Sequence, residues 1–212
     1  MIVLSATIRQ RITCSGFVDR IFQREALDST VEEAKRLISE EKLLASNALI
    51  ITDCKKDRDS GDSSEGLYFS LIIPEKMDES FGRTALLAVA ETIEDFFNRA
   101  TSIERNNRIL IGGKRVAEVD FSQMENHSIF SVSIDDFSAF YSGNLSPEEY
   151  KSANLLPKWA GSLLGNMIYR IAAYHFSFKS NGFTFFQAGY ENRLMGGSSD
   201  NTMLLLERCK LR

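Results

Sequence analysis

The sequence has no long apolar run, only two histidines, and no excess of basic residues. No stretch approaches the roughly 20 apolar residues that a membrane helix needs, and residues 1–7 are too short for the apolar region of a signal peptide. We therefore expect a soluble, cytoplasmic protein. A net charge of −4 gives no general attraction to phosphate backbones or anionic lipid, so neither nucleic acid nor a membrane is expected as a partner.

Cysteine and histidine are too sparse and too scattered to predict a metal site or a disulfide framework. Cys14, Cys54 and Cys209 are an odd number, and none lies in a C-x-x-C pair. Unpaired thiols in a reducing compartment are the simplest interpretation. His127 and His175 are far apart in the sequence, and the aromatic neighbours of His175 favour a packed side chain over a metal ligand.

The length and composition of the sequence predict one domain that spans residues 1–212. It contains three prolines, no proline-rich linker and no internal repeat. Hydrophobic residues make up 43% and charged residues 25%, which is typical of a globular protein that buries a core.

The first half of the chain predicts two helices and two strands. Residues 30–42 have the helical spacing of apolar side chains, and Asp28, Ser29 or Thr30 could cap this helix. Residues 48–52 and 66–73 read as strands, and residues 84–97 carry the apolar stripe of a helix on a sheet. Between the strands, residues 53–65 have no periodicity or apolar anchor, so we expect a mobile loop.

The second half predicts a hairpin, a strand and a long helix. Gly112 and Gly113 suit a type I′ turn within residues 108–121. A strand at 128–137 and a helix at 155–178 follow, and a flexible turn at 196–201 precedes a last strand at 203–206. The fold class is therefore α+β, with a mixed β-sheet and helices mainly on one face.

Several of these segments carry motifs that occur in the same order in a known family. D-S-T at residues 28–30, G-L-Y-F-S at 66–70, the hairpin at 109–117 and Y-E-N-R-L at 190–194 together resemble the catalytic domain of biotin protein ligases. The resemblance implies the class II synthetase-like biotin/lipoate ligase fold. It also implies that residues 196–212 are a remnant of that family's small C-terminal domain.

The resemblance implies a specific chemistry. Members of the family use ATP and Mg²⁺ to convert biotin to biotinyl-adenylate, which a lysine of a biotin carrier protein then attacks. By position in the motifs, the residues implied around the cofactor are Ser29, Thr30, Gly66 and Ser70. The implied catalytic residues are Asn107, Arg115, Lys56 and Arg58. Alternation along the strand predicts that residues 66, 68 and 70 face the pocket and that 67, 69 and 71 face the helices.

The sequence departs from the family at two catalytic motifs. The family's G-R-G-R-x-G loop corresponds to residues 53–62, which contain one glycine and four aspartates. In the segment that corresponds to K-W-P-N-D, Glu104 replaces the lysine and Arg108 the aspartate. Losing one preorganised cationic donor typically costs about 100- to 1,000-fold in rate. Two hypotheses therefore stay open: a divergent biotin protein ligase, and a non-catalytic relative that keeps the fold for binding or scaffolding. A homodimer is also left open.

Overall fold

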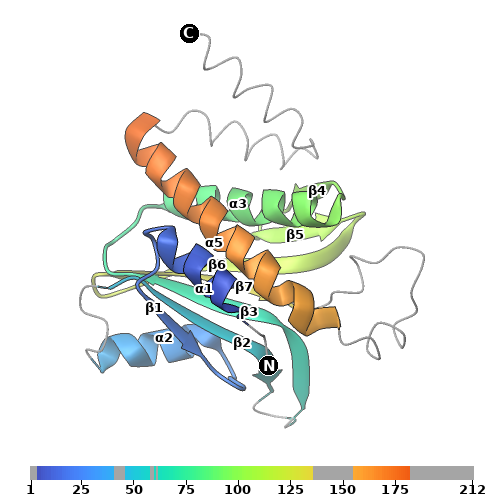
Figure 1. Cartoon of the computed structure of the whole chain (residues 1–212), viewed down its shortest axis with the longest axis horizontal. Coiled ribbons are helices and arrows are strands. Elements are labelled where there is room, and N and C mark those ends of the chain that lie inside the picture. The colour runs from blue at the N-terminus through green and yellow to red at the C-terminus, as the bar shows by residue number, and fades with distance from the viewer. Residues whose placement is uncertain (1–3, 41–45, 58–59, 61, 136–154, 182–212) are drawn as a thin grey trace.

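A computed structural model describes residues 4–40, 46–57, 60, 62–135 and 155–181. The described part contains four helices and one seven-stranded sheet (Figure 1). In chain order the elements are α1 (Ala6–Cys14), β1 (Arg20–Gln23), α2 (Thr30–Ser39), β2 (Ala48–Lys56), β3 (Ser63–Ile73), α3 (Glu79–Phe97), β4 (Thr101–Ile103), β5 (Arg108–Ile111), β6 (Lys114–Met124), β7 (His127–Ile134) and α5 (Leu155–Asn181).

The strands form a mixed sheet in the order β1-β2-β3-β7-β6-β5-β4. β1 runs parallel to β2, and all the other neighbours are antiparallel. The hairpin from β5 to β6 turns at Gly112 and Gly113, which both have the positive φ (57° and 80°) of a type I′ turn. The mixed sheet, the α+β class and the hairpin are as predicted.

The larger hydrophobic core lies between one face of the sheet and helices α1, α3 and α5. Figure 1 shows α3 and α5 running across this face with α1 beside α5. Leu67, Phe69 and Leu71 of β3 are fully buried here, which confirms that these positions face the helices. His175 of α5 packs against Phe17 (ring centroids 5.0 Å apart), in agreement with the predicted packed role.

The smaller core lies on the opposite face, where α2 is the one helix among the described elements. Ala34, Leu37 and Ile38 pack onto Ile50 and Ile72 of the sheet. Ser29 caps α2, because its side chain accepts a hydrogen bond from the Glu32 N–H (3.3 Å). Three of the four described helices thus lie on one face, as predicted.

The predicted loop at residues 53–65 is wrong for most of its length. β2 continues through Lys56 and β3 begins at Ser63, with Lys56 paired to Ser63. The outer parts of these arms, residues 55–56 and 63–65, are exposed and polar. Backbone pairing holds them rather than an apolar face, so the pattern gave no strand signal. α1, β1 and β4 were also not predicted. The predicted turn at 196–201 and strand at 203–206 lie outside the described residues.

The remaining helices agree with the expected segments. α3 begins earlier than predicted, where Asp78 caps it by accepting from the Phe81 N–H (3.2 Å). α5 covers the expected range of 155–178 and continues to Asn181. None of the described helices is long and apolar enough to cross a membrane.

Candidate functional site

An open cleft of about 550 Å³ lies where the N-terminus of α2 meets the β2–β3 hairpin, and we call it the α2 cleft. Its lining comes from the start of α2, the end of the hairpin and the residue that follows β7. The lining residues are Asp28, Ser29, Glu32, Lys55, Lys56, Asp57, Ser60, Asp62, Ser63, Ser64 and Asp135. Two predicted site residues, Ser29 and Lys56, are therefore brought together here.

The α2 end of the cleft is shaped by helix capping. The Ser29 hydroxyl accepts a hydrogen bond from the Glu32 N–H, and the Glu32 carboxylate forms an ion pair with the Lys35 ammonium (Oε1 to Nζ 2.8 Å). Acidic side chains at a helix N-terminus also interact favourably with the helix dipole. The carboxylates of Asp28 and Glu32 therefore have a structural reason to stand at this end of α2.

The hairpin side of the cleft presents two lysines. A register shift between Thr52 and Cys54 interrupts the pairing, and Lys55 and Lys56 lie beyond it, opposite Ser64 and Ser63. The Lys55 ammonium lies 6.0 Å from the centre of the Tyr68 ring, at the outer limit for a cation–π contact.

Tyr68 of β3, which was predicted to face the pocket, lies next to the lining residue Ser64. Only 2% of the residue is exposed, and its hydroxyl is 3.0 Å from the Ser64 hydroxyl. Burial raises the pKa of the Tyr68 hydroxyl; the Ser64 hydrogen bond opposes that shift, and the nearby charge of Asp135 adds to it. Tyr68 does not line the cleft itself, and it contacts the cleft through the hydroxyl of Ser64, a lining residue. Its position between 66 and 70 on the predicted pocket face was the available signal.

Gly66 and Ser70 of β3 and Thr30 of α2, three of the residues predicted around the cofactor, are not among the lining residues of the α2 cleft. Ser70 is fully buried and donates a hydrogen bond to the Thr30 hydroxyl (2.8 Å), which joins β3 to the first turn of α2. A Cβ on Gly66 would stand 2.4 Å from the Ile134 carbonyl oxygen and 2.7 Å from the Tyr68 ring. Packing alone therefore accounts for glycine at position 66, and the cofactor roles of these three residues stay predictions.

Arg115 reaches the cleft only through a carboxylate. Its guanidinium donates to Glu118 at 3.1 Å and lies 3.6 Å from Asp135, a lining residue. Glu118 also lies 3.6 Å from Arg108. Arg115 thus keeps the charge expected at its motif position, but two carboxylates face that charge.

Asn107 and Glu104 lie at the turn between β4 and β5 and do not line the α2 cleft. Asn107 has φ +60°, its N–H donates to the Glu104 carbonyl (3.0 Å), and its carbonyl accepts from the Val119 N–H (3.1 Å). Asparagine tolerates this left-handed conformation well. β4 is the fourth strand beyond β3, which corresponds to roughly 19 Å across a flat sheet. The α2 cleft therefore does not extend to Arg108 or to the turn that holds Asn107.

The charge of the α2 cleft is negative. Its lining has five carboxylates and two ammonium groups, a formal charge of −3. Lys35 and Arg115, which pair with Glu32 and Asp135, would bring the balance only to −1. Arg58, a predicted loop cation, lies outside the described residues, and the adjacent Asp59 carries the opposite formal charge. No group of three or more His, Cys, Asp or Glu in the described part of the chain is arranged to hold a metal ion.

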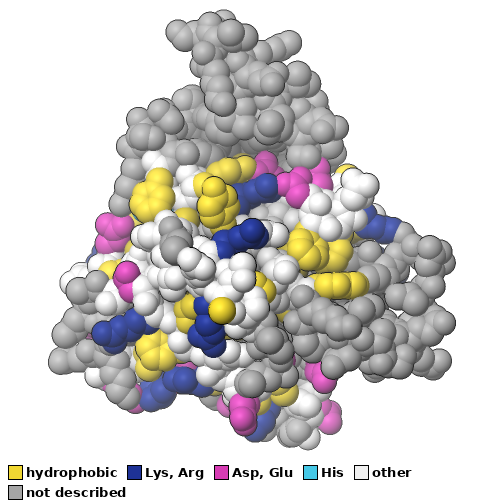
Figure 2. Space-filling view, viewed as in Figure 1, with side chains coloured by type: hydrophobic (Ala, Val, Ile, Leu, Met, Phe, Trp, Pro, Cys, Tyr) yellow, Lys and Arg dark blue, Asp and Glu magenta, His cyan; other side chains and the backbone are white. Residues whose placement is uncertain are grey.

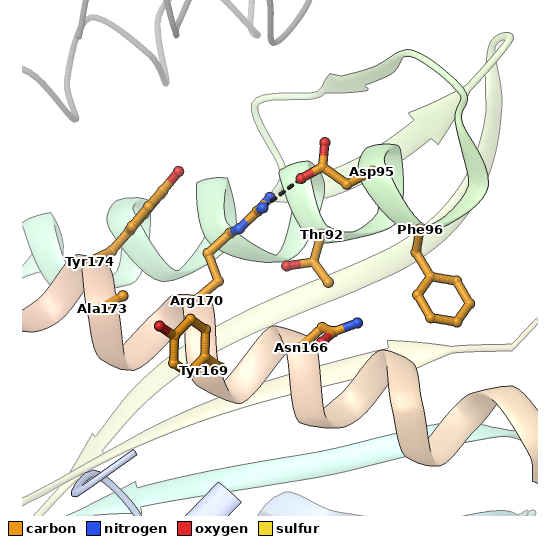
Figure 3. Close-up of a pocket in the computed structure, with 8 residues that line it drawn as sticks. All are labelled: Thr92, Asp95, Phe96, Asn166, Tyr169, Arg170, Ala173 and Tyr174. Carbon is orange, nitrogen blue, oxygen red and sulfur yellow. Dashed lines mark hydrogen bonds and ion pairs between the residues drawn. The ribbon is translucent and has the colours of Figure 1, made fainter. Parts of the chain in front are cut away.

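A second cavity, also of about 550 Å³, lies between α3 and α5 on the other face of the sheet. Figure 3 shows Arg170 of α5 pointing toward Asp95 of α3, and the two side chains form an ion pair. Burial would lower the pKa of the Arg170 guanidinium, but the bond to Asp95 and the nearby charges outweigh it, so the pKa is raised. Hydrophobic side chains on this face stand in separate groups between charged ones (Figure 2), and Tyr169 and Phe176 are exposed. None of the predicted site residues that the structure describes lies here.

Comparison with solved structures identifies the fold. Biotin protein ligase from Aquifex aeolicus in complex with biotin and ATP is 21% identical, with a TM-score of 0.61 over 83% of this chain and 78% of that one. The enzyme from Leishmania major in complex with biotinyl-5-AMP is 11% identical, with a TM-score of 0.54 over 85% and 82%. Biotin acetyl coenzyme A carboxylase synthetase from Helicobacter pylori with bound biotinylated ATP has 11% identity and a TM-score of 0.51 over 76% and 80%. No protein-family model and no curated protein matches the sequence. The chain has the fold of the biotin protein ligase catalytic domain.

Proposed function

We propose that this chain is a biotin protein ligase-like protein that binds biotin and a biotin carrier protein. One observation carries the proposal: the Ser70–Thr30 hydrogen bond joins the G-L-Y-F-S strand to the D-S-T helix start, on a fold that solved biotin ligases share. A helix N-terminus also suits the carboxylate of biotin, because its first N–H groups point outward and its dipole favours an anion. Ser29, Thr30, Gly66 and Ser70 are the proposed residues around the acid.

The complete ligase reaction is the competing function. It would attach biotin to a carrier lysine with ATP and Mg²⁺, and Asn107, Arg115, Lys56 and Arg58 would be its catalytic residues. The retained positive charge of Arg115 favours this function. The described residues do not fit the phosphates of ATP, however, because carboxylates outnumber cations in the cleft and Arg115 is paired. We therefore favour a binding or scaffolding role, and location in the cytoplasm and homodimer formation stay predictions.

Calorimetric titration of the full chain with biotin tests the proposal. We expect saturable binding that weakens in Ser29→Ala, since Ser29 lines the cleft and caps α2. Asp78→Ala is the matched control, because it removes the cap of α3, away from the cleft. Both losses should cost about 1 kcal/mol of stability. Absence of biotin binding by the wild-type chain would refute the proposal, and so would equal loss of affinity in the two variants.

The family reaction is measured separately, by incubating the chain with biotin, Mg-ATP and a biotin carrier domain. Transfer of biotin to the carrier lysine would favour the competing function. Binding of the carrier without transfer would favour the scaffolding role.

A further inference from the structure

We infer that this chain does not form an adenylate, because the charge of the α2 cleft excludes the phosphates of ATP. If biotin binds as proposed, it therefore stays in its free acid form, and this part of the inference rests on the proposed function. The exclusion of ATP does not depend on biotin and can be tested without it.

Carboxylates outnumber ammonium groups on the lining of the α2 cleft. Asp57, Asp62 and Asp135 face the same open space as Lys55 and Lys56. ATP carries several negative charges, and like charges brought together in this cleft repel. Stabilising a carboxylate beside a phosphate instead needs positive charge that is fixed in place before the reaction.

Two cations near the cleft, Lys35 and Arg115, already have carboxylate partners. Lys35 lies 2.8 Å from Glu32, and Arg115 lies between Glu118 and Asp135. A phosphate that recruited Arg115 would have to displace Asp135 and leave that carboxylate in the cleft. A phosphate and Asp135 would therefore compete for the Arg115 guanidinium.

The backbone at the base of the β2–β3 connection is hydrogen-bonded within the hairpin. Close approach of main chain to a phosphate is easiest where glycines leave the N–H groups uncovered. Here the segment is a hairpin whose arms pair at Lys55–Ser64 and Lys56–Ser63, and the Asp57 N–H donates to the Asp62 carbonyl (2.8 Å). These groups are used to close the hairpin.

The test compares Mg-ATP binding by wild type and two variants with the same change in net charge. Asp62→Lys with Asp135→Lys reverses two exposed cleft carboxylates and releases Arg115 from one partner. Glu79→Lys with Glu125→Lys reverses two exposed carboxylates at the start of α3 and in the β6–β7 turn. Circular dichroism checks that each variant folds. If the double lysine variant of the cleft does not fold, Asp62→Asn with Asp135→Asn replaces it in the comparison.

We expect no Mg-ATP binding and no biotin-dependent exchange of pyrophosphate into ATP by the wild type. The cleft variant should gain affinity for Mg-ATP by about tenfold or more over the distant control, and added salt should weaken that binding. Binding of Mg-ATP by the wild type, or exchange of pyrophosphate, would overturn the inference. Equal affinities in the two lysine variants would overturn it as well, because charge in the cleft would not be the cause. Failure of biotin to bind, with ATP still excluded, would refute only the proposed function.

Discussion

Replacing Gly66 by alanine would place a methyl group where the structure has no space for one. The new Cβ would lie 2.4 Å from the Ile134 carbonyl oxygen, and 2.7 Å from Cζ and from the hydroxyl of Tyr68. Carbon atoms at these separations overlap, so something must shift. The tyrosine is buried and the carbonyl belongs to a paired strand, so neither can move freely.

We expect Gly66→Ala to lower the free energy of unfolding by about 3 kcal/mol, the upper part of the range for overpacking, because main chain must move. For a domain of this size, that loss corresponds to a decrease of about 6–12 °C in Tm. Urea denaturation should show a lower midpoint with an unchanged slope. Adding Tyr68→Leu should recover only part of the loss, since the contact with Ile134 remains.

Gly165→Ala is the matched control. The nearest atom to its new Cβ, apart from the helix's own backbone, is Cγ2 of Ile8 at 3.4 Å, an ordinary contact. Alanine is favoured over glycine in a helix interior, so this variant should be stabilised by about 0.5–1 kcal/mol. The reasoning is refuted if Gly66→Ala is as stable as wild type, and a ligand role would then be the better account of that glycine.

Three further substitutions test other contacts. Ser70→Ala removes the buried hydrogen bond to Thr30 and should cost about 1 kcal/mol in urea denaturation, whereas exposed Ser39→Ala should change little; equal losses would contradict the role given to that bond. Tyr174→Phe removes the hydroxyl that donates to buried Glu91 and should lower the free energy of unfolding by about 1–3 kcal/mol. Tyr169→Phe changes an exposed ring and should be near neutral. The reverse order of the two losses would contradict the assignment. Hydrogen bonding to Arg36, and to Arg24, holds the pKa of Glu33 below 4.5 against the effect of burial, so its contribution to stability is complete above that pH and is lost as pH falls through the lower folded-state value. Thermal denaturation across this acidic range should therefore depend less on pH in Glu33→Gln, and an unchanged pH profile would count against the pairing.

The sequence predicted those elements whose signals are local. Ser29 and the apolar positions of α2 indicate the start and the buried face of that helix. Alternation along β3 separates Leu67 and Phe69 from Tyr68 and Ser70, because each successive side chain points to the opposite face. The Gly112–Gly113 turn requires a positive φ at both positions, so the hairpin was also predictable.

The elements that were missed are stabilised by partners distant in sequence. Lys55 and Lys56 are in a strand because Ser64 and Ser63 pair with them, although their side chains are exposed. β1 is held by its parallel pairing with β2, which its short sequence of two polar and two apolar residues does not indicate.

The site was predictable only in part for the same reason. Motif order identified Ser29 and Lys56, which do meet in the cleft. It could not show that Asp135 faces Arg115, because the pairing of β6 with β7 brings these two residues together. It also could not show that the Ser70 hydroxyl donates to Thr30 of α2, 40 residues away in the sequence.

The unequal coverage of the two faces of the sheet has a consequence for how the molecule opens. α2 is fixed by a few apolar contacts, whereas α3 and α5 share the larger core. Opening of one element costs less where few apolar contacts hold it, and backbone amides then exchange with solvent without global unfolding. We expect the amides of α2 to exchange faster than those of α3. A ligand at the α2 N-terminus would slow that exchange, so its affinity would include the energy needed to keep α2 docked.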